Sequence, residues 1–496
     1  MDCLAADAGI GASVQLLAAK AAPSRLTQVH NQTRYTCTEV IIHRSVPAAC
    51  CNPLNVFTFA RLEPMQPPSN THRTLIVVML MAVMVISVLD KTIFAFAGPQ
   101  IIDELQLSPE QFGFIGSAFF FLYSVSGVLV GFLANRLPSR WILSGMSVVW
   151  MAAQILTAIS TSFYALVASR MLLGAGCGPG TAVTQHACFK WFSPRERVQP
   201  AAWIQVAIMV GAIAGALSLP VLIQHTGWRV GYLILAGIGL IWLVIWLLIG
   251  REGQHDDTVA EGGNGTVPYR HLLLNRTFIF ITLAGFCTYL PTALIYSWVP
   301  TYLQKGLLMT PMQSGYVVMA ATVGVIFLNL AISSLSQRAL KRGASIRMAM
   351  AVPPAIACLI GGAALSLMGF LEQDLYSTMA LYLVGGVVVN LVPAFANSIV
   401  AYIAPPKQRG SMLAIHIGLM TTAGMLAPHM VGQTIGWEGG DLVKGFELSI
   451  GLFGIALLVG GLLALRLVDP ERSRQALTLI TSNAASSHHE PSASQA

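Results

Sequence analysis

The chain has 496 residues, of which 55% are hydrophobic and only 10% are charged. Soluble globular proteins carry about 25% charged residues, so this composition excludes an ordinary soluble domain and indicates that the lipid bilayer is the main solvent. The net charge of +7 could suggest a nucleic-acid partner, but the positions of the charges, given below, argue against one.

Residues 1–72 are expected to form an N-terminal tail. Within it, 1–64 mix apolar and polar residues without a clear period, and no basic region of a signal peptide is visible. Met65 precedes a short polar lead and the first apolar segment. One hypothesis is that Met65 is the true start and that 1–64 are a gene-model artefact. The alternative is a disordered cytoplasmic tail.

Twelve apolar segments follow, each long enough for a membrane-spanning helix of about 20 residues. A polar, glycine-rich stretch at 251–276 divides them six and six and is predicted to be a flexible cytoplasmic linker. We therefore predict an all-α integral membrane protein with six-helix bundles at 73–250 and 277–470 and a disordered tail at 471–496. The predicted spans are 75–98, 112–134, 141–160, 164–187, 200–223, 229–250, 278–300, 313–335, 347–370, 376–399, 410–434 and 447–468.

Basic residues predict the orientation, because short cytoplasmic loops are enriched in Lys and Arg. The odd-numbered loops hold only Arg229, Lys305 and Lys444. The positive charge thus serves membrane topology rather than nucleic-acid binding, and both termini are expected to be cytoplasmic. The even-numbered loops and the segment after the last span hold Arg136, Arg140, Lys190, Arg195, Arg197, Arg251, Arg270, Arg276, Arg338, Lys341, Arg342, Arg347, Lys407, Arg409, Arg466, Arg472 and Arg474.

Several chemistries have no signature in the sequence. The eight cysteines show no C-x-x-C pair and no metal-ligand spacing with histidine. A phosphate-binding Gly-x-x-x-x-Gly-Lys-Ser/Thr loop and a Ser-His-Asp constellation are equally lacking. We therefore expect no metal, no cofactor and no enzymatic activity, and an energy source in an ion gradient or in the substrate's own gradient.

Similar loops recur at corresponding places in the two halves. Gly131-Phe-Leu-Ala-Asn135-Arg136-Leu-Pro138-Ser-Arg140 follows the second span, and Ser336-Gln337-Arg338-Ala-Leu-Lys-Arg-Gly follows the eighth. These loops resemble the Gly-x-x-x-Asp-Arg-x-Gly-x-Arg signature of the major facilitator superfamily, whose aspartate latches one conformation. Asn135 and Gln337 replace that aspartate. An amide can hydrogen-bond without charge assistance, so a weaker latch is expected.

Further stretches resemble the anion:cation symporter branch of that superfamily, which includes sugar-acid, hexuronate, tartrate and phthalate permeases. The resemblance implies the major facilitator fold, a substrate site near the bilayer midplane between the halves, and a small organic anion as substrate. The matching stretches are Asp90-Lys91, Gly116-Ser-Ala-Phe-Phe-Phe-Leu-Tyr123, Arg170-x-x-x-Gly174-x-Gly176, Trp191-Phe-Ser-Pro-Arg-Glu-Arg197, Gly227-Trp-Arg and Ser297-Trp-Val-Pro-Thr-Tyr-Leu303.

Ionisable residues inside spans are costly and are functional candidates by default. A guanidinium such as Arg170 can bind a carboxylate with two hydrogen bonds, and the resemblance assigns it to the substrate. By the same resemblance Asp90 is the proton-coupling site, and Lys91 stands where the branch has an arginine. The structural alternatives are an arginine that binds helix-end carbonyls and an ion pair that lines the cavity.

Two departures from the branch concern the pocket. Cys177 lies two helical turns after Arg170, at a position where the branch has a second proton-carrying glutamate, and a small packing residue is the simpler interpretation. Val88 replaces a tyrosine of the branch. Other predicted substrate-binding residues are Tyr123, His416, Asn390, Asn397 and Gln205, and the alternative for each is ordinary packing within a helix bundle.

The sequence thus favours a secondary transporter of the cell inner membrane, monomeric by analogy with the fold, that imports a small organic anion with protons. With Asp90 as the only strong carrier, one proton per monoanion is expected. The first alternative is a proton-antiport efflux carrier for drugs or metabolites, against which the cationic Arg170 and Lys91 argue. The second is a transporter-like sensor that binds a ligand without turnover.

Overall fold

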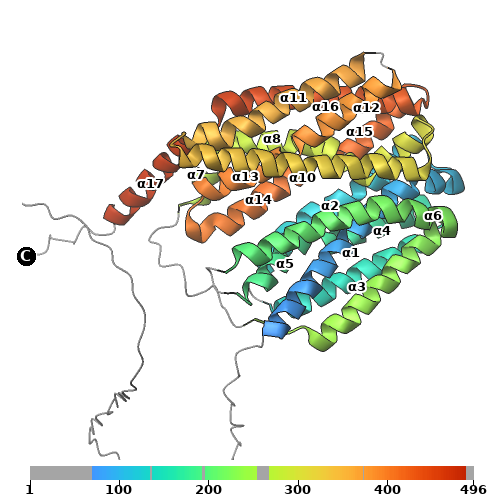
Figure 1. Cartoon of the computed structure of the whole chain (residues 1–496), viewed down its shortest axis with the longest axis horizontal. Helices are drawn as coiled ribbons and strands as arrows, with labels where there is room; N and C mark the ends of the chain where they lie inside the picture. Colours follow the sequence, from blue (N-terminus) through green and yellow to red (C-terminus); the bar gives the residue numbers. More distant parts are fainter. Residues whose placement is uncertain (1–69, 134–136, 193–195, 254–266, 372–373, 488–496) are drawn as a thin grey trace, which may run out of the picture. The chain divides into compact units, whose positions relative to one another are not determined.

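The computed structural model describes residues 70–133, 137–192, 196–253, 267–371 and 374–487, and residues 67–496 form one compact unit. The predictions for 1–64, including the start at Met65, lie outside these residues. Every regular element in the described part is a helix (Figure 1). The elements are α1 (Asn70–Leu105), α2 (Pro109–Leu133), α3 (Ser139–Ala158), α4 (Phe163–Cys177), α5 (Gly180–Phe189), α6 (Val198–Ile249), α7 (Tyr269–Leu273), α8 (Arg276–Ala293), η2 (Leu294–Tyr296), α9 (Val299–Thr301), η3 (Tyr302–Gly306), α10 (Pro311–Lys341), η4 (Arg347–Ala351), α11 (Val352–Phe370), α12 (Leu375–Val389), α13 (Val392–Ile403), η5 (Pro406–Gln408), α14 (Arg409–Thr421), α15 (Ala423–Trp437), α16 (Leu442–Leu467) and α17 (Pro470–Ser487).

Ten helical segments of the described chain are long and apolar enough to cross a membrane. The difference from the predicted twelve has two causes. The 52 residues of α6 contain both predicted spans 200–223 and 229–250, which meet at a kink at Gly227 with φ 78°, a conformation that glycine adopts without strain. The predicted span 164–187 is divided into the shorter helices α4 and α5 at Gly178-Pro179.

Two predicted boundaries differ from the structure. Residues from 471 onward were expected to be disordered, but α17 continues as a helix to Ser487. The predicted loop at 336–345 is mostly helical, because α10 continues to Lys341 through residues with good helix propensity. The helix is followed by Gly343 with φ 88°, a left-handed conformation that commonly terminates helices.

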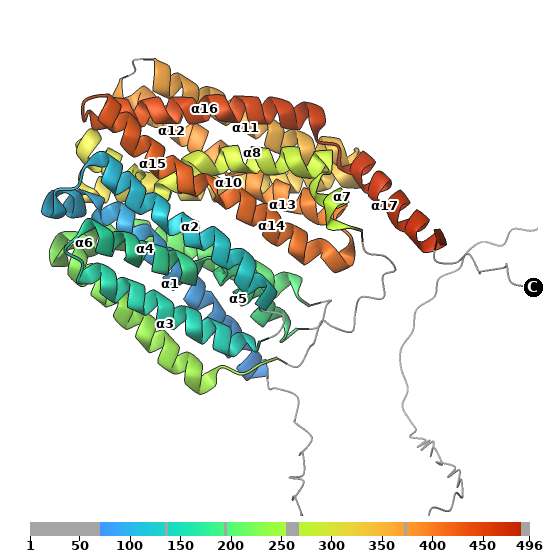
Figure 2. The ribbon, with the colours of Figure 1, turned by 180° about the vertical axis from the view of Figure 1, so that it is seen from behind.

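The helices pack as two bundles. In the first bundle, α1 and α3 pack on α6, and α2 and α3 pack on α4; in the second, α11 packs on α12 and α16, while α8 and α15 pack on α16. The extensive contacts between the bundles are made by α2 with α14 and α15, by α6 with α10, and by α1 with α9 and η2. Both views show the bundles diverging toward the end where α5, α7 and α17 lie (Figures 1 and 2).

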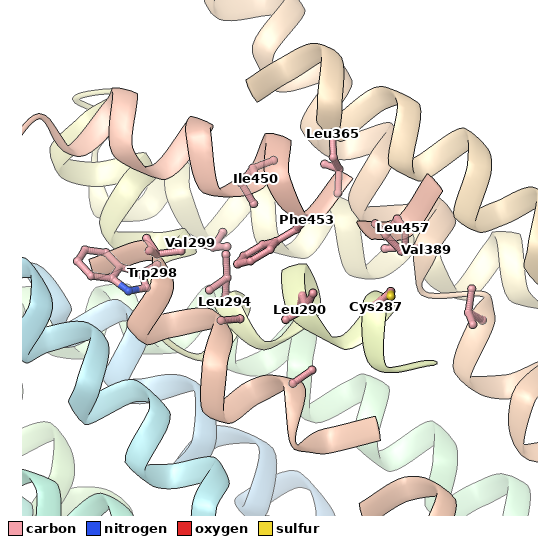
Figure 3. Close-up of a cluster of buried hydrophobic side chains, with 14 of the residues drawn as sticks. Cys287, Leu290, Leu294, Trp298, Val299, Leu365, Val389, Ile450, Phe453 and Leu457 are labelled. Carbon is pink, nitrogen blue, oxygen red and sulfur yellow. The ribbon is translucent and has the colours of Figure 1, made fainter. Parts of the chain in front are cut away.

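A buried apolar cluster holds the second bundle together. Figure 3 shows Phe453 of α16 close to Leu290 and Leu294, with Val389 and Leu457 further along the same cluster. Phe453, Leu294, Val389 and Leu457 are each at most 1% exposed. Their burial fixes the rotation of α8 and α16 about their axes, and with it the side chains that these helices present elsewhere.

The end of the molecule at which α1 is followed by α2, here called the far face, is closed between the bundles. Close helix approach depends on glycine: a Cβ at Gly113 would lie 2.4 Å from the Pro428 carbonyl oxygen, and one at Gly432 would lie 2.5 Å from that of Pro109. Asp103 and Lys305 form an ion pair between the bundles at the same end. The opposite end, where the chain passes from Gly250 to Arg276, is called the linker face.

We expect Gly432→Ala to weaken this far-face closure. The added methyl group would meet a backbone oxygen that cannot move independently, so α2 and α15 must separate. Hydrogen exchange measured by mass spectrometry should show faster exchange in α15 and at the start of α2. Gly410→Ala is the matched control, because a Cβ there would meet nothing within 4 Å. Equal exchange in the two variants would contradict the closure mechanism.

The linker face repeats one arrangement in both bundles. The carboxylate of Glu252, after the sixth span, accepts a hydrogen bond from the Ser139 backbone N–H where α3 begins. In the second bundle, the carboxylate of Glu471 accepts one from the Ile346 backbone N–H before η4. A carboxylate at a helix N-terminus is favourable because it satisfies free N–H groups and complements the helix dipole. The matching positions support the internal repeat that the sequence predicted.

The Glu252 carboxyl predicts a pH dependence of stability. Burial alone would raise its pKa, but hydrogen bonds from the Lys190 ammonium and from the Ser139 and Arg140 backbone outweigh burial, and the pKa is lowered. A lowered folded-state pKa adds stability above the unfolded-state value of about 4.3 and loses it as pH falls through the folded-state pKa. The Tm difference between the wild type and Glu252→Gln should therefore be constant at neutral pH and shrink in acid. A difference that persists unchanged in acid would contradict this.

Candidate functional site

Asp90 lies on α1 inside the first bundle and is 2% exposed. Its carboxylate accepts a hydrogen bond of 2.6 Å from the Gln154 side-chain amide of α3, and Gln154 is itself 1% exposed. A buried carboxylate held by one neutral amide can exist in the protonated or the ionised form, because the amide can donate to either oxygen. Gln154 was not predicted, although an amide in the middle of an apolar span was a visible signal.

Lys91 and Asp90 occupy adjacent helical positions, which do not face each other, and the described structure contains no ion pair between them. Its ammonium lies 5.5 Å from the ring centre of Tyr123 on α2. It lies within electrostatic range of Tyr296 in the second bundle and of Asp90. Lys91 is only partly buried, so its charge is presented between the two bundles.

Aromatic side chains from both bundles meet beside this ammonium, next to Tyr123. The Phe120 ring centre lies 6.1 Å from that of Tyr123, 5.8 Å from that of Tyr289 and 6.5 Å from that of Tyr296. We call Lys91, Phe120, Tyr123, Tyr289 and Tyr296 the aromatic cluster. Tyr289 and Tyr296 were not predicted, because one tyrosine in an apolar helix gives no indication of which face it occupies.

Arg170 lies on α4 and is 1% exposed. Its guanidinium carbon is 4.4 Å from the ring centre of Phe94 and 4.8 Å from that of Phe119, so the group is held between aromatic rings. Nε and Nη1 make no hydrogen bond to any described residue. Buried polar atoms are normally paired, and leaving one unpaired costs about 1–3 kcal/mol, more for a charged group. This makes Arg170 a candidate for function rather than for packing alone.

Two buried groups adjoin Arg170. Cys177, 1% exposed, ends the same helix and lies within electrostatic range of Arg170, Lys91 and Asp90. The Tyr232 side chain of α6 is fully buried, and its hydroxyl has no hydrogen-bond partner among the described residues. Tyr232 interacts electrostatically with Arg170 and Asp90. Its role was not predicted, because it follows the motif Gly227-Trp-Arg without belonging to it.

The structure does not bring the other predicted site residues into contact with this centre. His416 is fully buried inside the second bundle, where Nδ1 pairs with the Thr282 hydroxyl at 2.8 Å. Asn390 ends α12 and donates to the Gly386 carbonyl, Asn397 is half-buried on α13, and Gln205 is exposed on α6. Their assignment to substrate stays a prediction.

The sequence of the chain also matches a known protein family. Residues 80–428 match the family model described as the Major Facilitator Superfamily. The chain belongs to the major facilitator superfamily. It is therefore a multi-pass membrane protein and a secondary transporter, not an enzyme.

Among the similar proteins, two transporters share about a quarter of their aligned residues with this chain. The chain is 25% identical over 380 residues to the hexuronate transporter of Bacillus subtilis (strain 168), covering 73% of this chain and 88% of that protein. It is 24% identical over 409 residues to a probable sulfoacetate transporter of Cupriavidus necator, covering 77% and 90%.

A solved structure supports the fold. A bacterial homolog of the human lysosomal transporter Spinster, in an inward-facing and unoccupied conformation, superposes with a TM-score of 0.68 at 16% identity. The match covers 83% of this chain and 99% of that one. At this identity the likeness establishes the major facilitator fold and leaves the substrate open.

The superfamily's signature loops are only partly described. Asn135 and Arg136 lie outside the described residues, and Gly131 lies in the last turn of α2. Arg140 donates from Nη2 to the Leu247 carbonyl, while Gln337 and Arg338 are exposed near the end of α10. The predicted latch role of these residues remains a prediction.

Proposed function

We propose that this transporter imports a small organic monoanion together with one proton, by alternating access between the two bundles. The observation that carries the proposal is the aromatic cluster, in which the Lys91 ammonium lies within range of the opposite bundle and forms no ion pair with a described carboxylate, Asp90 interacting with it only at longer range. A substrate carboxylate would supply that missing charge. The aromatic rings and phenols would contact the rest of a small acid.

Asp90 is proposed as the proton carrier. It lies one residue before Lys91 on α1, and the Gln154 amide is its hydrogen-bond partner. Proton uptake at Asp90 and carboxylate binding at Lys91 would each neutralise one buried charge. Each charge that is neutralised lowers the cost of moving this centre through the low-dielectric interior, so the loaded bundles can rock more readily than bundles in which these two charges are unpaired.

Arg170 is proposed as a second positive group that contributes to carboxylate binding. Its Nε and Nη1 find no acceptor among the described residues, and the rings of Phe94 and Phe119 hold the guanidinium in place. Because Arg170 is buried more deeply than Lys91, we expect Lys91 to meet the substrate first. Any contact of the substrate with Arg170 would then require the helices of the first bundle to rearrange.

The relatives support an anionic substrate. Their names specify a hexuronate and a sulfoacetate, both of which are small organic anions. We propose the class of sugar acids, aromatic acids or dicarboxylates for this chain. The basic linker face is proposed to be cytoplasmic and the membrane to be the cell inner membrane, with the monomer as the working unit.

The proton stoichiometry follows from the carboxylates that are present. A monoanion moving inward against ~100 mV costs about 2.3 kcal/mol. One proton cancels that charge and makes uptake electroneutral. Cys177 stands where a second carboxylate would be expected from the resemblance, and an apolar setting keeps a thiol neutral. We therefore propose one proton per monoanion.

The test is uptake by the purified full chain in proteoliposomes. A panel of sugar acids, aromatic acids and dicarboxylates is offered with and without an inward proton gradient, and counterflow of labelled substrate covers electroneutral transport. Uptake of an organic acid that is stimulated by the gradient supports the proposal. Transport of cationic drugs with no acid moving would overturn it, and an inward positive current with a monoanion would overturn the stoichiometry.

A further inference from the structure

A basic pocket lies on the linker face of the second bundle, away from the aromatic cluster. Its volume is about 380 Å³. Four arginines from four elements line it: Arg276 of α8, Arg347 of η4, Arg466 of α16 and Arg472 of α17. Residues distant in sequence therefore place their positive charges around one concave site.

The charge of this pocket is not balanced within the described structure. None of the four arginines forms an ion pair with a described carboxylate. The one acidic residue in the lining, Asp469, accepts a hydrogen bond from the Arg472 backbone N–H. Nearby Glu471 is engaged by the Ile346 N–H. The pocket thus carries a net charge near +3 and fits a multivalent or strongly hydrogen-bonding anion.

An apolar surface begins directly beside the pocket. Ile279 and Leu283 lie three and seven residues after Arg276, and Leu462 and Val459 lie four and seven residues before Arg466. These spacings place each pair on the same helix face as its arginine. The four side chains are between 36% and 52% exposed, and α8 packs against α16. The two pairs therefore form apolar stripes on the neighbouring helices α8 and α16, and these stripes point into the bilayer region.

We propose that this pocket binds the phosphate head group of an anionic phospholipid, with the acyl chains lying on the apolar stripes of α8 and α16. A guanidinium binds phosphate oxygens with paired hydrogen bonds, and basic pockets between spanning helices are suited to lipid head groups. Free phosphate would bind the arginines but would leave the adjoining apolar surface without a ligand. The adjoining apolar stripes favour a ligand that is both anionic and lipidic.

The site lies where it could influence transport. Arg347 donates from Nη2 to the Leu465 carbonyl, and the Thr277 hydroxyl pairs with the Asp469 backbone and the Ser473 hydroxyl. A lipid bound here would therefore contact α8, α16 and α17 together. Because α8 leads to Tyr289 of the aromatic cluster, occupancy would bias the position of a helix used in substrate binding.

The test uses the purified full chain after delipidation in detergent. Native mass spectrometry measures the binding of dioleoylphosphatidylglycerol, of dioleoylphosphatidylcholine with the same acyl chains, and of inorganic phosphate. The wild type should prefer phosphatidylglycerol. The double variant Arg466→Gln/Arg472→Gln should bind it about twenty-fivefold more weakly, since each surface arginine contributes about fivefold. Both side chains are exposed, so folding should be retained.

The control variant is Lys407→Gln/Arg409→Gln, which removes two exposed charges outside the pocket. Its affinity for phosphatidylglycerol should change less than about twofold. Equal binding of the two lipids, unchanged affinity in the double variant, or an equal loss in the control would each overturn the site. Displacement of phosphatidylglycerol by millimolar inorganic phosphate, with no contribution from the acyl chains, would overturn the assignment to lipid.

Discussion

Asp90→Asn should retain substrate exchange but lose proton-driven accumulation. Asparagine is nearly the same size and can still pair with the Gln154 amide, so the local packing of α1 on α3 is preserved. It cannot bind and release a proton. With one proton per monoanion, a gradient of one pH unit supports at most about tenfold accumulation. The variant should reach a ratio near one, measured in proteoliposomes with the acid identified by the panel.

Glu447→Gln is the matched control for this experiment. Glu447 lies on α16 and accepts a hydrogen bond of 2.7 Å from the Tyr302 hydroxyl, which a glutamine oxygen can also accept. Among the described residues, no hydrogen bond or ion pair joins Glu447 to the aromatic cluster. The control should accumulate substrate like the wild type. Normal accumulation by Asp90→Asn together with loss in Glu447→Gln would place the proton carrier in the second bundle.

Lys91→Gln should lower substrate affinity by about thirtyfold or more. Truncation of one member of a hydrogen-bonded charge pair costs about 2–5 kcal/mol, and the partial exposure of Lys91 argues for the lower end. The affinity is measured as the half-saturating concentration for counterflow. Lys91→Arg, which retains the charge, should recover most of the binding because the substrate carboxylate again meets a cation at position 91.

Arg170→Met separates the roles of the two cations. Methionine fills much of the space between Phe94 and Phe119, so the aromatic contacts are partly retained. If Lys91 meets the substrate first, Lys91→Gln should raise the half-saturating concentration more than Arg170→Met does. If Arg170→Met instead raises the half-saturating concentration more, and Lys91→Gln stays near the wild-type value, the principal anion site would be Arg170.

The apolar spans were recognised from the sequence alone. Hydropathy over about 20 residues is a local property, so the apolar segments and the internal repeat could be recognised without knowledge of packing. The same local reasoning identified Asp90, Lys91 and Arg170, because a charge inside an apolar helix is costly wherever its partners lie. Where the structure differed, as at the end of α10 and in α17, the error concerned helix boundaries.

Only the tertiary structure decided which side chains meet. The pairing of Asp90 with Gln154 and the meeting of Tyr289 and Tyr296 with Phe120 depend on the rotation of separate helices about their axes. That rotation is set by buried contacts such as those of Phe453 in the second bundle. The basic pocket likewise requires four elements to end at one place. A single sequence specifies each helix locally, but the free energy that selects their mutual orientation comes from packing between helices.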